Sequence, residues 1–468
     1  MSASVAGASF WATPGLSAVL AALNAGGEEA RVVGGAVRNT LLGLPVTDVD
    51  IATTALPEVV VERARAAGLK PVPTGIEHGT VTVVADHHAF EVTTLREDTQ
   101  TDGRRAVVRF GRSWQHDAER RDFTLNALYA TPGGAVVDLV GGLPDLAARR
   151  IRFIGDADAR IREDYLRILR LYRFHAAYGA GPVDAAAFTA TVRRRAGLPA
   201  LSRERVRAEM LKLLVAPGAA ATLAVMSDAG LLQPLLAGIA DVAALEKMAA
   251  LEAGCGLSPD PVRRLGALAL RVPDDAERLR ERLRLSNAEG RRLAGMARAL
   301  GGSGGSALAA RIAGGAASYA EGAGPSGQCT ARAARPGASI SAGAGSAGAG
   351  FSGLMPAGWR AFPLLPASGD ARAARAFLYA EGGEAGLDLA LLAAVHGWHG
   401  LETVARLAAA WMPPRPPFAA ADLMALGLKP GRALGQALAR VEAAWIAADF
   451  PDDPSTIANL VARAVAEG

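Results

Sequence analysis

The sequence is short of cysteine, lysine and aromatic residues, and these shortages exclude several kinds of protein. Cys255 and Cys329 are the only cysteines among 468 residues and lie far apart, which excludes a disulfide framework and a cysteine metal site. Such sparing use of cysteine is typical of a reducing compartment, so we expect a cytoplasmic protein. Only four of the 50 basic residues are lysines. A GC-rich gene accounts for most of the arginine excess, although planar guanidinium groups also suit phosphates and base edges.

Long apolar runs are also missing, so no segment is expected to cross a membrane. The first residues lack the basic start of a secretion signal, and Pro14 followed by spaced apolar residues predicts a helix there. The formal net charge of +4 permits a nucleic-acid partner without requiring one. With 50% hydrophobic and 21% charged residues, the chain is expected to form two to four globular domains.

The hydrophobic pattern changes along the chain from mixed strands and helices to helices alone. ARVVGGAVR predicts a strand, a glycine turn and a helix start, whereas PVTDVDIAT and GTVTVVADHHAFEVTTLR predict strands, the latter a hairpin turning near Asp86. REDTQTDGRRAVVRFG predicts a loop, AERRDFTLNALYA a helix and GGAVVDLVGG a strand. From about residue 145 helices are expected, among them DADARIREDYLRILRLYRFHAAYG and SRERVRAEMLKLLVAP, the second with Ser202 as its N-cap.

Residues 301–365 interrupt the helical part. Most of this segment is rich in Gly, Ala and Ser, without clear periodicity and with few large apolar side chains. Such a composition buries too little surface to offset its ordering entropy, so we expect poor order. A genuine flexible insertion and a reading-frame slip in a GC-rich gene both explain it. Helical patterns resume near Ala371.

The stretch VTDVDIAT places Asp48 and Asp50 within an apolar run. In a strand both carboxylates share one face, since successive side chains alternate. Bare like charges that close repel each other, whereas a divalent cation such as Mg²⁺ offsets the repulsion and assists phosphoryl transfer. A solvent-facing edge strand with two acids is the competing explanation. Glu91, in the apolar stretch FEVTTLR, is either a third carboxylate of this group or a strand-edge charge.

Two arginine-containing stretches are consistent with a nucleotide site. Gly34 and Gly35 precede a helix start, where backbone N–H groups favour anions, and Arg38 lies one turn further on. In RRDFTLNAL, Arg121 can offset charge on a leaving pyrophosphate. An ordinary tight turn explains the glycines equally well, and an ordinary Arg–Asp pair explains the second stretch.

The stretch EDYLRILRLYRF suggests a way of choosing a base. Asp164 and Arg167 are three residues apart, so they are neighbours on a helix. Cytosine and adenine each present an amino donor beside a ring-nitrogen acceptor, which this acid and arginine match. Uracil and guanine present the reverse order and would leave buried polar groups unpaired. A solvated i,i+3 salt bridge is the alternative.

Together these stretches resemble the class II CCA-adding enzyme and bacterial poly(A) polymerase family of nucleotidyltransferases. The matching parts follow in order over residues 30–215: GGAVRNTLLG with DVD, HGTVTVV with FEVTTLR, TDGRRAVVRFG, RRDFTLNALY, EDYLRILRLYRF and SRERVRAEMLKLL. ADLMALGLKPGRALGQALARVEAAWIAADF also looks like that family's tail. Asn39 and Tyr165 depart from the family pattern, which commonly has Asp and Pro there.

The resemblance implies an α+β fold: a nucleotidyltransferase head with a small mixed β-sheet, followed by all-helical parts. Residues 1–140 would be the catalytic head, 141–215 the base-selecting neck, 216–300 the RNA-binding body and 366–468 the tRNA-binding tail. The implied activity is template-independent addition of C, C and A to the 3′ end of tRNA from CTP and ATP. The alternatives are a poly(A) polymerase, a CC-only or A-only enzyme, and a non-catalytic RNA-binding relative.

The resemblance also assigns roles to individual residues. Asp48 and Asp50 would hold catalytic Mg²⁺, with Glu91 beside them. The nucleotide would be bound by a further set of residues: Gly34, Gly35, Arg38, Arg121, Asp122, Asn126, Asp164, Arg167 and Arg170. Of these, Arg38 and Arg121 would contact the triphosphate, and Asp164 with Arg167 would serve as the template for the base.

Overall fold

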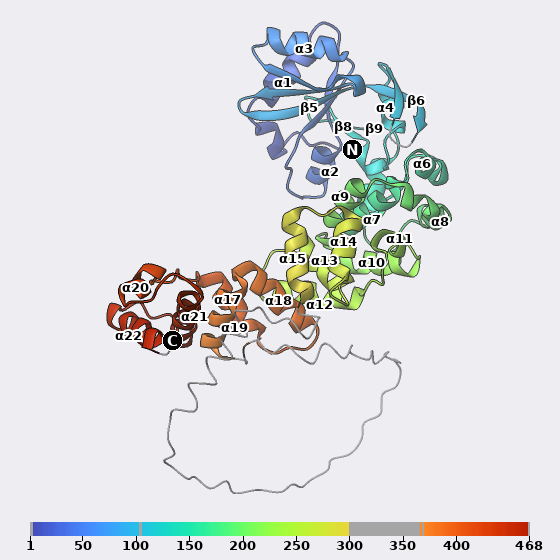
Figure 1. Cartoon of the computed structure of the whole chain (residues 1–468). Helices are drawn as coiled ribbons and strands as arrows, with labels where there is room; N and C mark the ends of the chain where they lie inside the picture. Colours follow the sequence, from blue (N-terminus) through green and yellow to red (C-terminus); the bar gives the residue numbers. More distant parts are fainter. Residues whose placement is uncertain (1–2, 103–104, 299–365, 367–368, 467–468) are drawn as a thin grey trace, which may run out of the picture. The chain divides into compact units, whose positions relative to one another are not determined.

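The computed structural model describes residues 3–102, 105–298, 366 and 369–466 (Figure 1). The chain divides into two compact units, Met1–Val242 with Glu281–Leu285, and Ala243–Arg280 with Ser286–Gly468. Within the described ranges, no helix is long and apolar enough to cross a membrane. The expected α+β class is confirmed, since every strand of the described residues lies in the first unit.

A seven-stranded mixed sheet forms the centre of the first unit, in the order β3-β4-β5-β2-β1-β8-β9. Only β2 and β5 pair in parallel, and the other neighbours are antiparallel. The strands are β1 (Ala30–Val33), β2 (Asp50–Thr53), β3 (Lys70–Gly75), β4 (Thr80–Ala85), β5 (His88–Thr94), β8 (Leu128–Ala130) and β9 (Val136–Asp138).

Alternating apolar residues make these strands and set their inward faces. In β4, Val81 and Val83 are buried while Thr80 and Thr82, which alternate with them, are partly exposed. The hairpin of β4 and β5 turns at Asp86 and His87, both with positive φ, as predicted. Helices α1 (Leu16–Leu23) and α3 (Pro57–Ala66) pack against the sheet, and the four predicted core residues of α1 are all buried: Leu16, Val19, Leu20 and Leu23.

The loop predicted for residues 96–111 is wrong. The segment forms a separate two-stranded antiparallel sheet, β6 (Arg96–Asp102) and β7 (Arg105–Phe110). The two strands of a hairpin pair through backbone N–H and C=O groups, so polar and basic side chains do not prevent the pairing. Arg112, just after the hairpin, donates to both carboxylate oxygens of Glu28 at 2.7 Å and so ties the hairpin's base to the head.

The helix predicted for AERRDFTLNALYA is also wrong. The stretch divides into the end of α4 (Trp114–Glu119), a 3-10 turn η3 (Thr124–Asn126) and strand β8. Strand β8 fits between β1 and β9 and is fully buried. Sheet pairing therefore overrides the helical spacing of the apolar residues.

Helices follow to the end of the first unit, as the pattern after residue 145 predicted. They are α5 (Gly142–Ala147), α6 (Ala157–Glu163), α7 (Leu166–Tyr178), α8 (Ala185–Arg194), η4 (Arg195–Ala200), α9 (Arg203–Leu214), α10 (Ala219–Asp228) and α11 (Gln233–Leu236). The single helix expected over DADARIREDYLRILRLYRF is wrong, because Asp164 is extended at φ −154° and separates α6 from α7. Ser202 is the N-cap of α9, although its side chain makes no capping bond.

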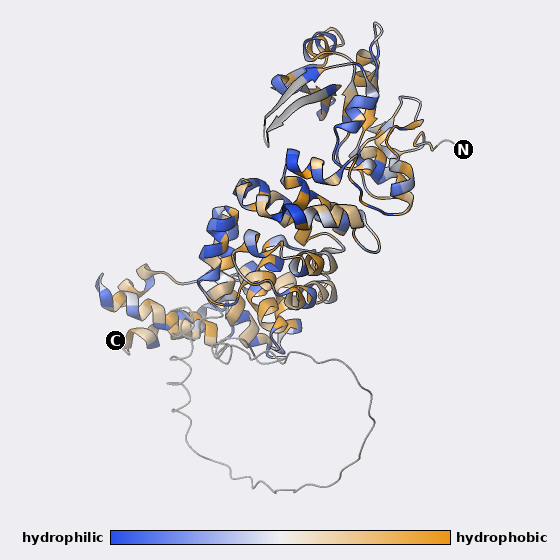
Figure 2. Cartoon of the chain, turned by 90° about the vertical axis from the view of Figure 1, so that its right-hand side faces the viewer, coloured by the Kyte–Doolittle hydropathy of each residue, from blue (hydrophilic) through white to orange (hydrophobic). Residues whose placement is uncertain are grey.

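The second unit is helical throughout its described residues. Its helices are α12 (Val242–Gly254), α13 (Pro261–Ala269), α14 (Asp275–Leu283, which ends in the first unit), α15 (Asn287–Arg298), α17 (Ala371–Glu381), α18 (Gly383–Val395), α19 (Leu401–Ala410), α20 (Ala420–Ala425), α21 (Arg432–Ala447) and α22 (Pro454–Ala466). Both hydrophilic and hydrophobic residues occur along these helices (Figure 2), as in helices that bury one side. The resumption of helix at Ala371 is confirmed, whereas the expected disorder of 301–365 lies outside the described residues.

Candidate nucleotide-binding active site

Two acidic side chains lie next to each other on neighbouring strands of the sheet, Asp50 on β2 and Glu91 on β5. Ile51 of β2 pairs with Val92 of β5, and both are fully buried. Asp50 and Glu91 precede these two residues, so they lie side by side on the opposite face. On its other side Asp50 is paired with Val33 of β1. The register therefore brings Asp50 and Glu91, 41 positions apart in the chain, to neighbouring places.

Asp48 joins these acids from outside the strand. The expectation that it shares a strand with Asp50 is wrong, because β2 begins at Asp50 and Asp48 is an exposed residue before it, accepting a 2.9 Å bond from the Thr47 hydroxyl. Burial by surrounding atoms raises the pKa of Asp50, and the charges of Glu91 and Asp48 raise it further, while Arg121 opposes them.

Two acids whose charges raise the pKa of a third form a donor set that suits a divalent cation. The fit is incomplete in one respect. Across the described residues, no three Asp, Glu, His or Cys side chains already converge on one metal position. Asp48, Asp50 and Glu91 are therefore close enough to interact electrostatically, but their side chains would have to move to coordinate one ion together.

The predicted glycine turn lies directly beside Asp50. Gly34 follows Val33 and has φ 71° and ψ −116°, a conformation that residues with a Cβ rarely adopt. Helix α2 (Gly35–Leu41) begins at the next residue. The backbone thus turns sharply beside Asp50, where a helix start favours anions.

Arg38 lies one turn into α2 and is buried. Its guanidinium donates to the Asn126 side chain at 2.6 Å and to the Tyr178 hydroxyl at 3.0 Å, and its charged centre lies 4.2 Å from the Tyr178 ring centroid. Burial lowers the pKa of Arg38. The structure therefore holds this arginine against the end of η3 and the end of α7.

Asp122 connects Asn126 to the helical part of the unit. One oxygen accepts from the Phe123 backbone at 2.9 Å and from Asn126 at 3.1 Å, and the other pairs with Arg170 at 2.6 Å. Burial opposes the charge of Asp122, but Arg170 and these bonds keep its pKa below the usual range. Arg38, Asn126, Asp122 and Arg170 thus form one continuous network from α2 to α7.

Arg121 extends from the segment after α4 toward the acids. It pairs with Asp117 at 2.9 Å and donates to the Tyr129 hydroxyl at 3.3 Å. Asp117 also pairs with Arg120 at 2.6 Å and is 1% exposed. Sequence reasoning missed this role of Asp117, which could have been found from its i,i+3 and i,i+4 spacing to two arginines.

Asp164 and Arg167 are neighbours, although not on one helix. The Arg167 backbone donates to the Asp164 carbonyl at 3.0 Å, but the side chains have different partners. Asp164 pairs with Arg205 at 2.5 Å, whereas Arg167 pairs with Glu163.

Arg160 is a further residue that the sequence did not single out. It pairs with Glu163 at 2.5 Å and also donates to the Arg121 carbonyl at 2.6 Å. The RRD stretch and the pair Asp164–Arg167 are therefore joined through Glu163. No periodic signal marks Arg160, because its partner is a backbone carbonyl 39 residues away.

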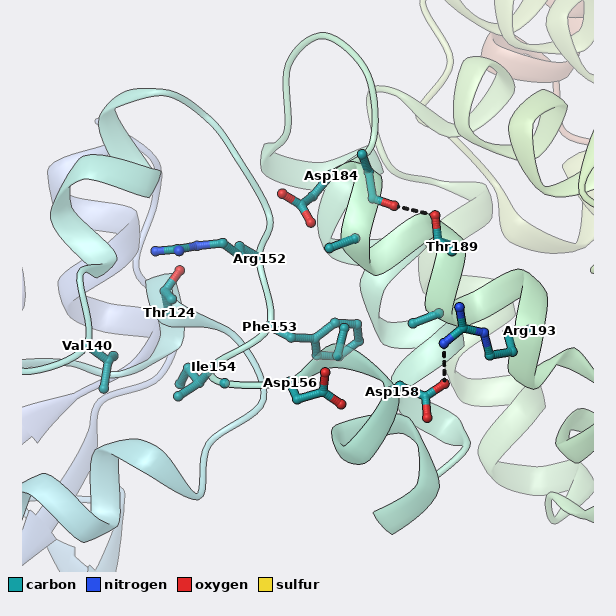
Figure 3. A pocket seen from close by; sticks show the side chains of 15 residues that line it. Thr124, Val140, Arg152, Phe153, Ile154, Asp156, Asp158, Asp184, Thr189 and Arg193 are labelled. Atoms are coloured by element: carbon teal, nitrogen blue, oxygen red, sulfur yellow. Dashed lines mark hydrogen bonds and ion pairs between the residues drawn. The ribbon is translucent and has the colours of Figure 1, made fainter.

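A large hollow of this unit lies elsewhere. A cavity of about 770 Å³ is lined by residues from Thr124 and the 152–158 segment and from α8 (Figure 3). It contains none of the predicted site residues. Its charged side chains already have partners, since Arg193 pairs with Asp158 and Asp184 caps α8. The concentration of acids and arginines at the sheet, and not this cavity, marks the candidate site.

Comparisons with known proteins agree with this location. Residues 30–152 match the family described as "Poly A polymerase head domain", and residues 188–242 match "Probable RNA and SrmB- binding site of polymerase A". The first match contains Gly34, Asp50, Glu91 and Arg121.

Among curated proteins, the chain is similar to "CCA tRNA nucleotidyltransferase 1, mitochondrial" of Danio rerio, at 41% identity over 56% of this chain and 61% of that protein. It is 44% identical to the "CCA-adding enzyme" of Leuconostoc citreum over 46% of this chain and 53% of that protein. The chain thus spans between about half and two thirds of the length of these relatives.

Among solved structures, the CCA-adding enzyme of Bacillus stearothermophilus in complex with CTP matches over 96% of both chains, with a TM-score of 0.64 and 26% identity. The agreement therefore extends beyond the head to the helical parts. The two family matches, the curated relatives and this structural match all support a likeness to the class II CCA-adding enzyme and bacterial poly(A) polymerase family of nucleotidyltransferases.

Proposed function

We propose that this protein adds C, C and A to the 3′ end of tRNA, using CTP and ATP and releasing pyrophosphate. The observation that carries the proposal is the grouping of Asp48, Asp50 and Glu91 beside Arg121 in the head of a chain whose curated relatives are named for CCA addition. In the reaction, the 3′ hydroxyl of the RNA attacks the α-phosphate of the nucleotide, and the bond to pyrophosphate breaks.

Members of this family generally depend on a divalent metal, and we propose that Asp48 and Asp50 hold Mg²⁺ with Glu91 beside them. The ion supplies charge stabilisation for the attacking and leaving oxygens. Asp50 and Glu91 lie on one face of the sheet and Asp48 just before strand β2, and the charges of Glu91 and Asp48 raise the pKa of Asp50, which favours a cation there. Coordination of an ion would return the pKa of Asp50 toward its ordinary range.

Arginines and the glycine turn would receive the triphosphate. Arg121 is close enough to act on the charge of Asp50, so it can meet a phosphate held by the same acids. Gly34 and Gly35 bring the backbone N–H groups of α2 to the same place. Arg38 is buried behind Asn126, where it adds positive charge and fixes the amide that faces the nucleotide.

Base selection is assigned to the start of α7. Asp164 can accept from the amino group of cytosine or adenine, and Arg167 can donate to the ring nitrogen beside it. Their present partners, Arg205 and Glu163, would orient them. Arg170 would assist by keeping Asp122 in place. Uracil and guanine would leave this pair unmatched, which costs about 1–3 kcal/mol for each unpaired group.

We propose that residues 1–140 carry the chemistry, 141–215 select the base, and 216–300 and 366–468 hold the tRNA. A cytoplasmic location fits the two cysteines, although the Danio rerio relative is named as mitochondrial. Poly(A) synthesis, CC-only or A-only addition and RNA binding without catalysis are the competing activities, and one assay separates them.

The assay offers tRNA lacking CCA, tRNA ending in CC and an unrelated RNA, with CTP and ATP supplied separately and together, in the presence of Mg²⁺. We expect addition of three nucleotides to the first tRNA, of one A to the second, and none to the unrelated RNA. Long A tails on any RNA would indicate a poly(A) polymerase. Addition stopping at CC, or of A alone, would indicate a divided activity.

The first variant to test is Asp48→Ala. We expect loss of all incorporation with tRNA binding retained, because the variant removes a proposed metal ligand that is exposed and makes one local hydrogen bond. Glu62→Ala is the matched control, since it removes an exposed acid from α3 in the same head. Near wild-type incorporation by the Asp48 variant would overturn the metal assignment.

A further inference from the structure

Asp117 and its partners form the most completely bonded side-chain cluster near the candidate site. Each oxygen of this buried carboxylate bonds a different arginine, Oδ1 accepting from Arg120 at 2.6 Å and Oδ2 from Arg121 at 2.9 Å. The Tyr129 hydroxyl donates to Oδ2 at 2.8 Å. Burial opposes the charge, but the two arginines and the tyrosine lower the pKa of Asp117 to about 2. The residue is therefore ionised at neutral pH.

The strand register fixes where this cluster lies. Val33 of β1 pairs with Asp50 on one side and with Tyr129 of β8 on the other. Residues paired across strands point to the same face, so Tyr129 lies on the acidic face, two strands from Asp50. At about 4.8 Å per strand, that places the tyrosine roughly 10 Å from the acid. Arg121, bonded to Tyr129 and acting on Asp50, spans this interval.

Arg121 is therefore attracted from two sides. Asp50 and its neighbouring acids attract the guanidinium toward the centre of the site, whereas Asp117 holds it toward β8. If the first attraction prevailed, the arginine would neutralise the acids and meet no phosphate. Asp117 is 1% exposed and bonded throughout, so it touches neither substrate nor metal itself.

We propose that Asp117 is a positioning residue that holds Arg121 away from Asp50 and ready for the nucleotide triphosphate, with Tyr129 fixing the carboxylate from β8. This inference rests on the proposed function and adds a residue to it. Asp117 contributes nothing through direct contact, so its effect should pass entirely through Arg121.

Asp117→Asn tests the proposal, because it keeps the shape and removes the charge. We expect the KM for CTP to rise roughly 10- to 100-fold, the usual range for a lost orienting partner, with a smaller change in kcat. Asp145→Asn is the matched control: Asp145 is also fully buried, pairs with Arg150 at 2.5 Å and Arg152 at 2.8 Å, and has no contact with the acids. Its variant should lose stability without raising the KM.

A double-mutant cycle separates positioning from general damage to the fold. If Asp117 acts through Arg121, then Asp117→Asn should change the KM less than twofold in an Arg121→Ala background. Equal effects in both backgrounds would overturn the proposal. Tyr129→Phe removes one bond and keeps the ring, so it should raise the KM by a smaller factor and serves if Asp117→Asn fails to fold.

The same variants distinguish failure of this inference from failure of the proposed function. A wild-type protein that adds CCA, with an Asp117 variant whose KM matches that of the Asp145 control, refutes positioning alone. A wild-type protein that incorporates no nucleotide refutes the proposed function. Equilibrium dialysis with labelled CTP then tests positioning, and unchanged binding in Asp117→Asn would refute it as well.

Discussion

At the scale of residues, the chemistry of the site is set by charges placed against one another. Asp50 has its pKa raised by burial and by two like charges, whereas Asp117 has its pKa lowered by two arginines and a tyrosine. Both are aspartates of one face of the head. Asp50 is thereby suited to bind a metal cation, whereas Asp117 is suited to hold the guanidinium group of an arginine of the protein itself.

The lowered pKa of Asp117 makes a prediction about acid stability. Its pKa is about 2 in the folded protein and 3.8 ordinarily, so the charge stabilises the fold above about pH 4 and the stabilisation is lost as the pH falls toward 2. The lost contribution is on the order of 2 kcal/mol. We expect the difference in unfolding free energy between wild type and Asp117→Asn to be constant from pH 8 to 5 and to shrink below about pH 4.

Urea unfolding of both proteins at a series of pH values measures this difference. The Asp145→Asn variant gives a second measurement of the same kind. Burial raises the pKa of Asp145, but its threonine and arginine partners lower it by more, so this pKa also lies below its ordinary value. A difference for Asp117→Asn that stays unchanged or grows as the pH falls below 4 would show that the carboxylate is not held ionised.

At the scale of elements, the strands that carry acids were predictable and the connections between them were not. Period-two alternation marks β4 and β5, and the glycine turn marks the junction of β1 and α2. The hairpin β6–β7 was missed because its side chains are mostly polar, and strand β8 was missed because its partner β1 is distant in the sequence. Local spacing cannot show that a short apolar run pairs with a strand about a hundred residues earlier.

The break between α6 and α7 is packed closely against η4, a contact that local sequence spacing does not indicate. Tyr165 follows the extended Asp164, and its ring lies where a Cβ on Gly197 would come within 2.0 Å of it. Glycine at position 197 therefore lets η4 approach the break closely. The packing holds the backbone that presents Asp164 and Arg167.

Gly197→Ala should consequently shift Tyr165 and lower the free energy of unfolding by about 1–3 kcal/mol, the usual cost of overpacking. If base selection is located as proposed, misincorporation of UTP should also rise. Gly133→Ala is the control, because the nearest atom to its added Cβ is 3.9 Å away. Denaturant unfolding and a nucleotide-competition assay measure the two effects, and equal stability of both variants would contradict the close packing.

At the scale of the whole molecule, the chain comprises two units with separate cores. The first surrounds the sheet, whereas the second includes a cluster around Trp445. Within the second unit a buried ion network joins helices from both sides of residues 299–365. Asp388 of α18 pairs with Arg263 of α13 at 2.9 Å and with Arg292 of α15 at 2.8 Å, and Arg263 also pairs with Glu252 of α12 at 3.1 Å.

Asp388→Asn should destabilise the second unit by about 3 kcal/mol, because it removes a fully buried carboxylate that pairs with both Arg263 and Arg292. Calorimetry should show a lower temperature for one transition, with a second transition and nucleotide binding unchanged. Asp449→Asn is the control in the same unit, since its pair with Arg375 is partly exposed and contributes about 1 kcal/mol or less. Equal losses in the two variants would show that the network does not hold this unit together.

The α+β class, the strands that hold Asp50 and Glu91, the glycine turn and the family resemblance could all be inferred from the sequence, since each depends on local periodicity or on motifs in order. Only the tertiary structure decided that Asp48 lies outside the strand, that Asp164 ends a helix and that Asp117 is buried between two arginines. The physical reason is that pairing across strands and burial of charge depend on residues far apart in the chain. Such contacts leave no periodic trace in the sequence.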